Sequence, residues 1–245
     1  MKMFKKFNKI FDKIASSGKH ETHTIFKDWL NMTIDKWTLP NNKPLFTQNK
    51  RYTQQEYNYF AELYIVYIKS MQKQLLQHNY FDFLGEWWES EKDLTDKFKE
   101  QYFTPHHVVQ LMAELTVDTT IKQPRIFYDC CCGSGRFALA HHSLRPLDYF
   151  VLEDLDDFAC KMTIMNMLHH GLVGVVTHKN SLTNEEYESW RVNEFLNNTG
   201  VLSVRSVRSE REGLSFIQSD LSVIEKEEKC IKSGTLDDYI HKGGK

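Results

Sequence analysis

The pattern of apolar and polar positions changes character near residue 101. Before that point apolar and aromatic residues recur at helical spacing, and they predict helices over residues 1–14, 25–37, 53–78 and 82–99. The first of these has apolar residues on one face and lysines on most of the other. We expect it to dock on the body of the protein, with a membrane surface or a DNA backbone as alternative contacts. Residues 1–100 are interpreted as an N-terminal helical domain.

After Gln101, short β-branched or aromatic runs alternate with helical patterns, which is typical of a parallel α/β sheet. A helix that carries Val108, Val109, Met112 and Leu115 is expected to begin with Thr104 as N-cap and Pro105 as first helical residue. The predicted strands are 125–131, 148–154 and 174–178, with helices over 136–143 and 156–169 between them. The fold class is therefore α/β, with the sheet domain at 101–200.

The sequence pattern that predicts helices and strands becomes weaker beyond Asn184. The pattern there predicts a helix over 185–197 and a strand over 201–207, followed by a polar, lysine-rich end. Residues 201–245 form a poorly defined C-terminal segment. Since fewer than half the residues follow Asp129, we expect a short sheet.

Composition narrows the class of protein. The 245 residues are 41% hydrophobic, which is enough for a globular core, but no apolar run approaches membrane-spanning length and lysines interrupt the first residues. We expect a cytoplasmic protein without a membrane segment. Five cysteines without paired metal-ligand spacing indicate reduced thiols. A net charge of −2 means that any DNA contact uses a local or partner-assisted surface.

The strongest motif is YDCCCGSGRFA at residues 128–138, where a predicted strand runs into a glycine turn and then a helix. Such a turn brings backbone amides and a helix N-terminus against a ligand. The glycine spacing also fits a dinucleotide fingerprint, with Glu153 placed for a ribose hydroxyl, so spacing alone leaves NAD and S-adenosylmethionine open. Asp129 favours S-adenosylmethionine, because a carboxylate attracts its cationic amino-acid end and repels a pyrophosphate.

Residues 80–185 resemble the modification subunits of type I restriction-modification systems and related adenine-N6 DNA methyltransferases. DFLG at 82–85 with WE at 88–89 resembles the segment leading into their cofactor site, QYFTP at 101–105 resembles their Phe-Thr-Pro motif, and VLEDLD at 151–156 resembles their acidic strand end. The resemblance implies a shortened Rossmann-like fold that binds S-adenosylmethionine. The cofactor-binding residues it implies are Gln101, Tyr102, Phe103, Thr104, Pro105, Asp129, Cys130, Gly133, Ser134, Gly135, Glu153, Asp154, Asn180, Ser181 and Leu182.

The resemblance also assigns roles to these residues. It implies that the glycine turn and Asp129 hold the methionine end, and that Glu153 binds both ribose hydroxyls. Asn180-Ser181-Leu182 stands where the family has Asp-x-Leu, whose acid recognises the adenine amine. Asn180 accepts a hydrogen bond through its carbonyl oxygen but carries no charge, so weaker cofactor affinity is expected.

The family's target-base motif, Asn/Asp-Pro-Pro-Tyr/Phe, is missing from the sequence. The prolines stand at positions 40, 44, 105, 124 and 146, and no two are adjacent. The nearest polar substitute, Asn197-Asn198, is better interpreted as a loop or helix C-cap. No catalytic residue is assigned.

Two functions remain open. The first is a DNA adenine methyltransferase, or one subunit of it whose partner chain supplies the acceptor groups. The second is an inactive scaffold or sensor that binds the cofactor and a protein partner. A nicotinamide-dependent enzyme is a third, weaker alternative. A protein partner or an oligomer is expected in either of the first two cases.

Two residue groups have simpler interpretations. Three histidine pairs, at 106–107, 141–142 and 169–170, lack metal-ligand spacing, so we expect exposed helix positions. The aromatic residues between 80 and 88 are expected in the helical core, with base stacking as the alternative.

Overall fold

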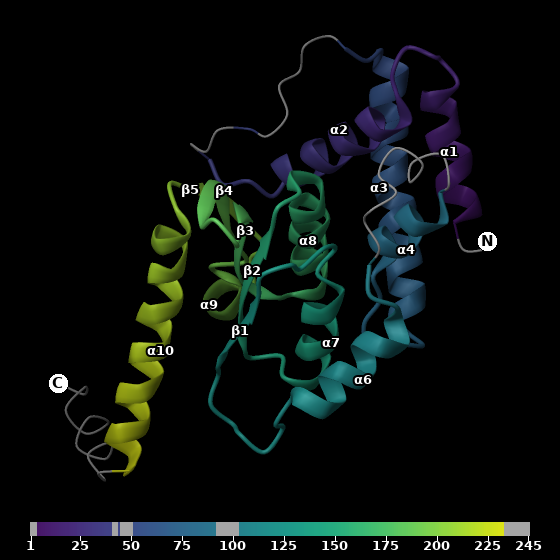
Figure 1. Ribbon diagram of the computed structural model, residues 1–245. Coiled ribbons are helices and arrows are strands. Elements are labelled where there is room, and N and C mark those ends of the chain that lie inside the picture. The colour runs from purple at the N-terminus through teal and green to yellow at the C-terminus, as the bar shows by residue number, and fades with distance from the viewer. Residues whose placement is uncertain (1–3, 41–43, 45–50, 92–102, 233–245) are drawn as a thin grey trace, which may run out of the picture.

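The computed structural model describes residues 4–40, 44, 51–91 and 103–232. In it, a group of N-terminal helices packs beside a β-sheet that contains both parallel and antiparallel strands, and helices cover both faces of that sheet (Figure 1). The helices α7 and α8 lie between the sheet and the N-terminal helices, whereas α10 lies on the opposite face.

The N-terminal helices follow the predicted pattern. They are α1 (Lys5–Ala15), α2 (Thr22–Asp35), α3 (Gln54–Leu75) and α4 (Phe83–Ser90). The apolar face of α1 is buried, so the expectation that this helix docks on the body is confirmed. Thr53 and Glu56 form a reciprocal capping box that fixes the start of α3. The part of the predicted helix 82–99 beyond Glu91 lies outside the described residues.

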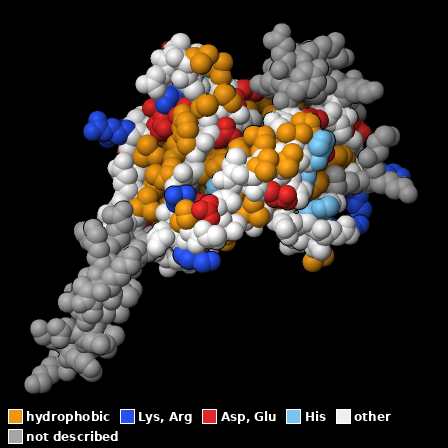
Figure 2. Space-filling view, turned by 60° about the horizontal axis from the view of Figure 1, so that its bottom comes forward, with side chains coloured by type: hydrophobic (Ala, Val, Ile, Leu, Met, Phe, Trp, Pro, Cys, Tyr) orange, Lys and Arg blue, Asp and Glu red, His pale blue; other side chains and the backbone are white. Residues whose placement is uncertain are grey.

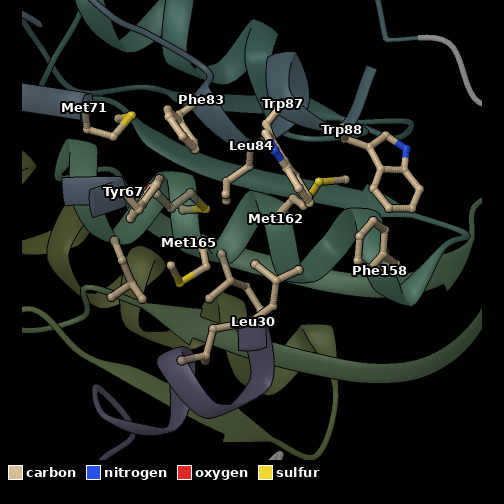
Figure 3. Packing of buried hydrophobic residues seen from close by; sticks show 14 of the residues in the cluster. Leu30, Tyr67, Met71, Phe83, Leu84, Trp87, Trp88, Phe158, Met162 and Met165 are labelled. Atoms are coloured by element: carbon tan, nitrogen blue, oxygen red, sulfur yellow. The ribbon is translucent and has the colours of Figure 1, made fainter. Parts of the chain in front are cut away.

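Aromatic residues from α4 pack into the core, as predicted. Trp87 and Trp88 are each 1% exposed, and the ring of Trp88 lies 4.4 Å from that of Phe158 on α8 (Figure 3). A single cluster of buried residues extends from α1 through α4 to α8 and the sheet. The predicted domain boundary near residue 100 lies outside the described residues, and side chains on both sides of it share this core.

The sheet has five strands in the order β1-β2-β3-β4-β5. They are β1 (Ile126–Asp129), β2 (Tyr149–Asp154), β3 (Val173–Asn180), β4 (Glu185–Val192) and β5 (Val204–Val207). The first three run parallel, connected by α7 (Arg136–Leu144) and α8 (Asp157–His170), and α6 (His106–Thr116) precedes them. The three predicted parallel strands are confirmed. The remaining pairs, β3 with β4 and β4 with β5, are antiparallel.

The helix predicted over 185–197 is wrong, because most of this segment forms β4 and only α9 (Leu196–Thr199) is helical. Glutamates favour a helix locally, but pairing with β3 buries Trp190 and Val192 and decides the outcome. Asn184 and Asn193, at the two ends of β4, both have positive φ, the turn geometry that asparagine tolerates. Asn197 and Asn198 lie in α9, which ends at Gly200 in the left-handed conformation, as the simpler interpretation predicted.

The sequence pattern predicts no helix or strand beyond residue 207, yet α10 (Glu210–Lys232) follows there. Its Phe216 and Ile217 pack on Tyr149, Val151 and Val175 and cover the second face of the sheet. None of the helices in the described part of the chain is both long and apolar enough to cross a membrane.

Candidate functional site

A cavity of about 450 Å³ opens where β1 and β2 end, a volume within the range of small-molecule sites. Of the residues predicted to bind a cofactor, its wall contains Phe103, Thr104, Asp129, Cys130, Gly133, Ser134 and Asp154. Those outside the wall are Pro105, Gly135, Glu153, Asn180, Ser181 and Leu182. Gln101 and Tyr102 lie outside the described residues. The structure therefore brings together about half of the predicted set.

The glycine turn forms the floor of this cavity. Asp129 ends β1, and α7 begins at Arg136 after Gly133 and Gly135, which both have positive φ. A Cβ atom on Gly133 would lie only 2.8 Å from Cδ1 of Phe103, so the phenylalanine ring rests directly on the turn. This contact joins two residues that sequence reasoning had placed in separate motifs.

The residue before α6 differs from the prediction. Pro105, with extended backbone, holds the N-cap position, and the helix begins at His106. Thr104 is one residue too early to cap it, and its carbonyl oxygen instead accepts a hydrogen bond of 2.9 Å from Nη1 of Arg136. The threonine thus fixes the cavity wall rather than the helix.

Two carboxylates face the cavity. Asp129 accepts a hydrogen bond from the Cys131 amide, and Asp154 accepts bonds from the amides of Gly133 and Asp156. Burial raises the pKa of both carboxyl groups, and for Asp129 the nearby charge of Asp154 raises it further. Among the described residues no lysine, arginine or histidine pairs with either carboxylate. The cavity therefore favours a ligand that carries positive charge.

Asp82 anchors the turn from the helical region. It is fully buried and accepts hydrogen bonds from Ser134 Oγ (2.6 Å), Arg136 Nε (2.9 Å) and Asn166 Nδ2 (2.9 Å), as well as from the Gly85 amide. This network joins the start of α4 to the glycine turn, α7 and α8. Buried polar groups that bond to one another in this way restrict the arrangement of the surrounding elements.

Arg136 extends the network to the cavity wall. Besides Asp82, its guanidinium donates to the Thr104 carbonyl oxygen and, at 2.9 Å, to Oε2 of Glu89. It thereby holds the segment that bears Phe103 against the turn. Sequence reasoning missed this role, although one signal was present: an arginine at the first position of a helix is unfavourable with the helix dipole unless acidic partners offset it.

Glu153 has its own partners away from the cavity wall. Its carboxylate is 1% exposed and accepts bonds from Lys179 Nζ (3.1 Å) and Ser181 Oγ (2.6 Å). Burial acts to raise the pKa of Glu153, but the bonds from Ser181 and Lys179 outweigh it and lower the pKa. Lys179 also pairs with Glu210 at 2.7 Å, and its two acidic partners raise its pKa to about 12. The carboxylate is thus neutralised within the protein.

Asn180 uses its side chain locally. Its Oδ1 atom accepts hydrogen bonds from the amides of Leu182 and Thr183, which makes a tight turn after β3. The Leu182 side chain is 98% exposed. In this arrangement the segment that follows β3 closes on itself and on Glu153.

Comparison with protein families matches this chain to N-6 DNA Methylase over residues 71–199, more than half of its length. The chain belongs to the N-6 DNA methylase family. The match contains the Asp82 network, the glycine turn and all of β1 to β4, so the cavity lies wholly in the family-related part of the chain. No curated protein and no solved structure matches the chain. Membership indicates a DNA methyltransferase-like function.

In this methylase-family chain His106 and both members of the second and third histidine pairs are partly buried, so the expectation of exposed positions is wrong for them and holds only for His107. Across the ranges that the structure describes, no three histidine, cysteine, aspartate or glutamate side chains are arranged to hold a metal ion. His170 instead lies in the packing between helices: its Nδ1 is 2.9 Å from the Asn166 carbonyl oxygen, and its Nε2 accepts from the Phe81 amide. Both bonds require a neutral imidazole, protonated on Nδ1.

His170 should make the protein less stable in mild acid. Burial lowers the pKa of His170 from 6.5 to about 4, so between these values the unfolded chain binds the extra proton. Stability is complete above the unfolded pKa and is lost as the pH falls toward the folded one. Between about pH 7 and about pH 5 the histidine should cost about 2 kcal/mol of unfolding free energy.

Urea unfolding across this pH range measures the effect. His170→Gln should show a smaller loss on acidification, whereas the control His107→Gln, at an exposed position of α6, should keep the wild-type pH dependence. Equal pH dependence in wild type and His170→Gln would contradict the assignment.

Proposed function

We propose that the cavity binds S-adenosylmethionine, and that the chain is the cofactor-holding subunit of a cytoplasmic DNA adenine-N6 modification system. The observation that carries the proposal is the pair Asp129 and Asp154, two partly buried carboxylates without a described cationic partner. The methyl donor has a positive ammonium group and a positive sulfonium, which complement these carboxylates. A dinucleotide would bring its anionic pyrophosphate against them instead.

The parallel unit β1-α7-β2-α8-β3 supports the finer assignment of a Rossmann-like fold, because ligands of such sheets bind outside the carboxyl ends of the strands. Asp129 would hold the ammonium group, and the backbone of the glycine turn would contact the methionine end. Phe103 supplies an aromatic face in the same wall. S-adenosylmethionine provides an activated methyl group, which the protein must align with a target amine.

Glu153 does not fit the simplest form of this proposal. For Glu153 to bind the ribose hydroxyls, the Ser181 hydroxyl must leave its carboxylate, while Lys179 can stay on the other oxygen. We therefore propose that cofactor entry displaces the 180–182 turn. Until it is displaced, the site is preformed at the methionine end only.

A partner chain would complete the site. The outer edge of β5 is covered by residues 37–39, which bond to both backbone groups of Val204. In contrast, no described strand pairs with the outer edge of β1, where Ile126 is 46% and Tyr128 is 55% exposed. Figure 2 shows hydrophobic side chains gathered on the underside of the molecule, and nearby α6 exposes Leu111 and Leu115. An open strand edge with apolar surroundings supports binding of another polypeptide.

Methyl transfer from tritiated cofactor to adenine-containing DNA tests the proposal. The pure chain should bind the cofactor but transfer no label, and addition of the product of a neighbouring gene should start transfer. If no tritium is incorporated into DNA in either condition, the proposed role in DNA modification is wrong. Cofactor binding by the chain is then measured separately.

A second candidate is a scaffold or sensor that binds the cofactor and a protein partner without turnover. It is favoured by the neutralised Glu153 and by the absence of an Asn-Pro-Pro-aromatic segment. Calorimetric binding without transfer under every partner condition would support it. Methyl transfer by the pure chain would overturn it.

A further inference from the structure

A basic groove lies between α1 and α3, away from the residues of the cofactor cavity. The two helices pack together and run antiparallel, since Lys13 near the end of α1 lies 4.7 Å over the ring of Tyr59 near the start of α3 (Figure 1). The beginning of α1 therefore meets the end of α3. The groove has a volume of about 750 Å³ and its wall contains Lys5, Lys6, Glu62, Ile65, Val66, Lys69, Ser70, Lys73 and Gln74.

Charge is concentrated in this groove. Four exposed lysines and one glutamate give it a net charge of +3, although the whole chain carries −2. No ion pair within the described ranges neutralises any of the four lysines. Like charges gathered this closely repel one another, and an anionic ligand would remove that cost. The groove is thus a local exception in an acidic protein.

We infer that this groove binds the sugar–phosphate backbone of DNA. The inference rests on the proposed function, in which DNA is the substrate. The positive charge of the groove complements a row of phosphates. Its wall includes Ile65, which is 51% exposed, and Val66, and these side chains offer apolar contact to deoxyribose rings between the phosphates. Backbone contacts of this kind position a protein on DNA without reading its sequence.

Fluorescence anisotropy with a labelled, adenine-containing DNA duplex tests this surface. Each lysine that contacts a phosphate contributes about 0.9 to the slope of log affinity against log salt concentration. The full chain carrying Lys69→Gln with Lys73→Gln should therefore lose about 2 from that slope and bind at least about tenfold more weakly at low salt. The control pair Lys36→Gln with Lys122→Gln alters exposed lysines outside the groove and should behave as wild type.

Three results would overturn the inference. They are absence of wild-type DNA binding at low salt, equal slopes for the groove variant and wild type, and groove-dependent binding of a polyglutamate peptide without groove-dependent DNA binding. The last result would assign the groove to an acidic protein segment. S-adenosylmethionine calorimetry on the same variants separates the two proposals, because the groove variant should retain cofactor binding whatever happens to DNA.

Discussion

Replacing Asp82 with alanine should lower the free energy of unfolding by about 3–5 kcal/mol. The substitution leaves the Arg136 guanidinium, whose side chain is 4% exposed, without its most buried acidic partner. Ser134 and Asn166 lose an acceptor at the same time. Arg136 keeps its pair with Glu89, but a buried charge that has lost one partner cannot recover hydration in the folded state, so the loss falls on stability.

Urea unfolding of the purified chain measures this loss, with Lys27→Ala as the control. Lys27 is 40% exposed, and its partner Asp157 keeps a second ion pair with Lys161, so the removal should cost only about 0–1 kcal/mol. Asp82→Asn keeps the shape but loses the charge, and should fall between wild type and alanine even if the alanine variant fails to fold. A loss below about 1 kcal/mol for both Asp82 variants would contradict the role assigned to the network.

Replacing Gly133 with alanine should weaken S-adenosylmethionine binding at least tenfold, by roughly 1.4 kcal/mol or more. The residue has φ +56°, and its new methyl group would lie 2.8 Å from the Phe103 ring. Phe103 must then move away from the turn, and the wall of the cavity moves with it. Separately from binding, strain in the left-handed backbone should lower the free energy of unfolding by about 1–3 kcal/mol.

Gly200→Ala is the matched control. Gly200 has φ +71°, but a Cβ atom there meets nothing within 4 Å. Both variants carry the backbone strain, and only Gly133→Ala disturbs Phe103. Calorimetric titration of the cofactor should therefore separate them, and equal affinity in the two variants would show that the Phe103–Gly133 contact does not shape the site.

The elements that the sequence predicts best are those with strong local patterns. The strands β2 and β3 are mostly buried runs of β-branched or aromatic residues, β1 is a half-exposed run of the same type, and α8 ends at Gly171 in the left-handed conformation. The strand β4 is predicted as a helix because glutamates at its start favour a helix locally. Its pairing with β3, which determines the strand, is not visible in the local sequence. The helix α10 is absent from the prediction because charged and polar residues dominate this stretch, although Leu214, Ile217 and Leu221 recur at helical spacing and belong to the cluster on the sheet.

The site shows the same limit. The glycine turn, Asp129 and Phe103 each belong to a short motif, and the fold brings them to one cavity. Asp82 and Arg136 are separated by 54 positions, so no local pattern indicates their pairing. The bond from Lys179 to Glu153 likewise depends on the register of neighbouring strands. Contacts of this kind follow from tertiary structure and not from residue spacing.

A structure of the chain with S-adenosylmethionine bound tests the central claim most directly. We predict the cofactor in the cavity beneath Phe103, with its ammonium group within hydrogen-bonding distance of the Asp129 carboxylate and its methionine end on the glycine turn. We also predict that Ser181 has left Glu153. A cofactor bound elsewhere, or a saturated complex in which Asp129 contacts no part of it, would contradict the account.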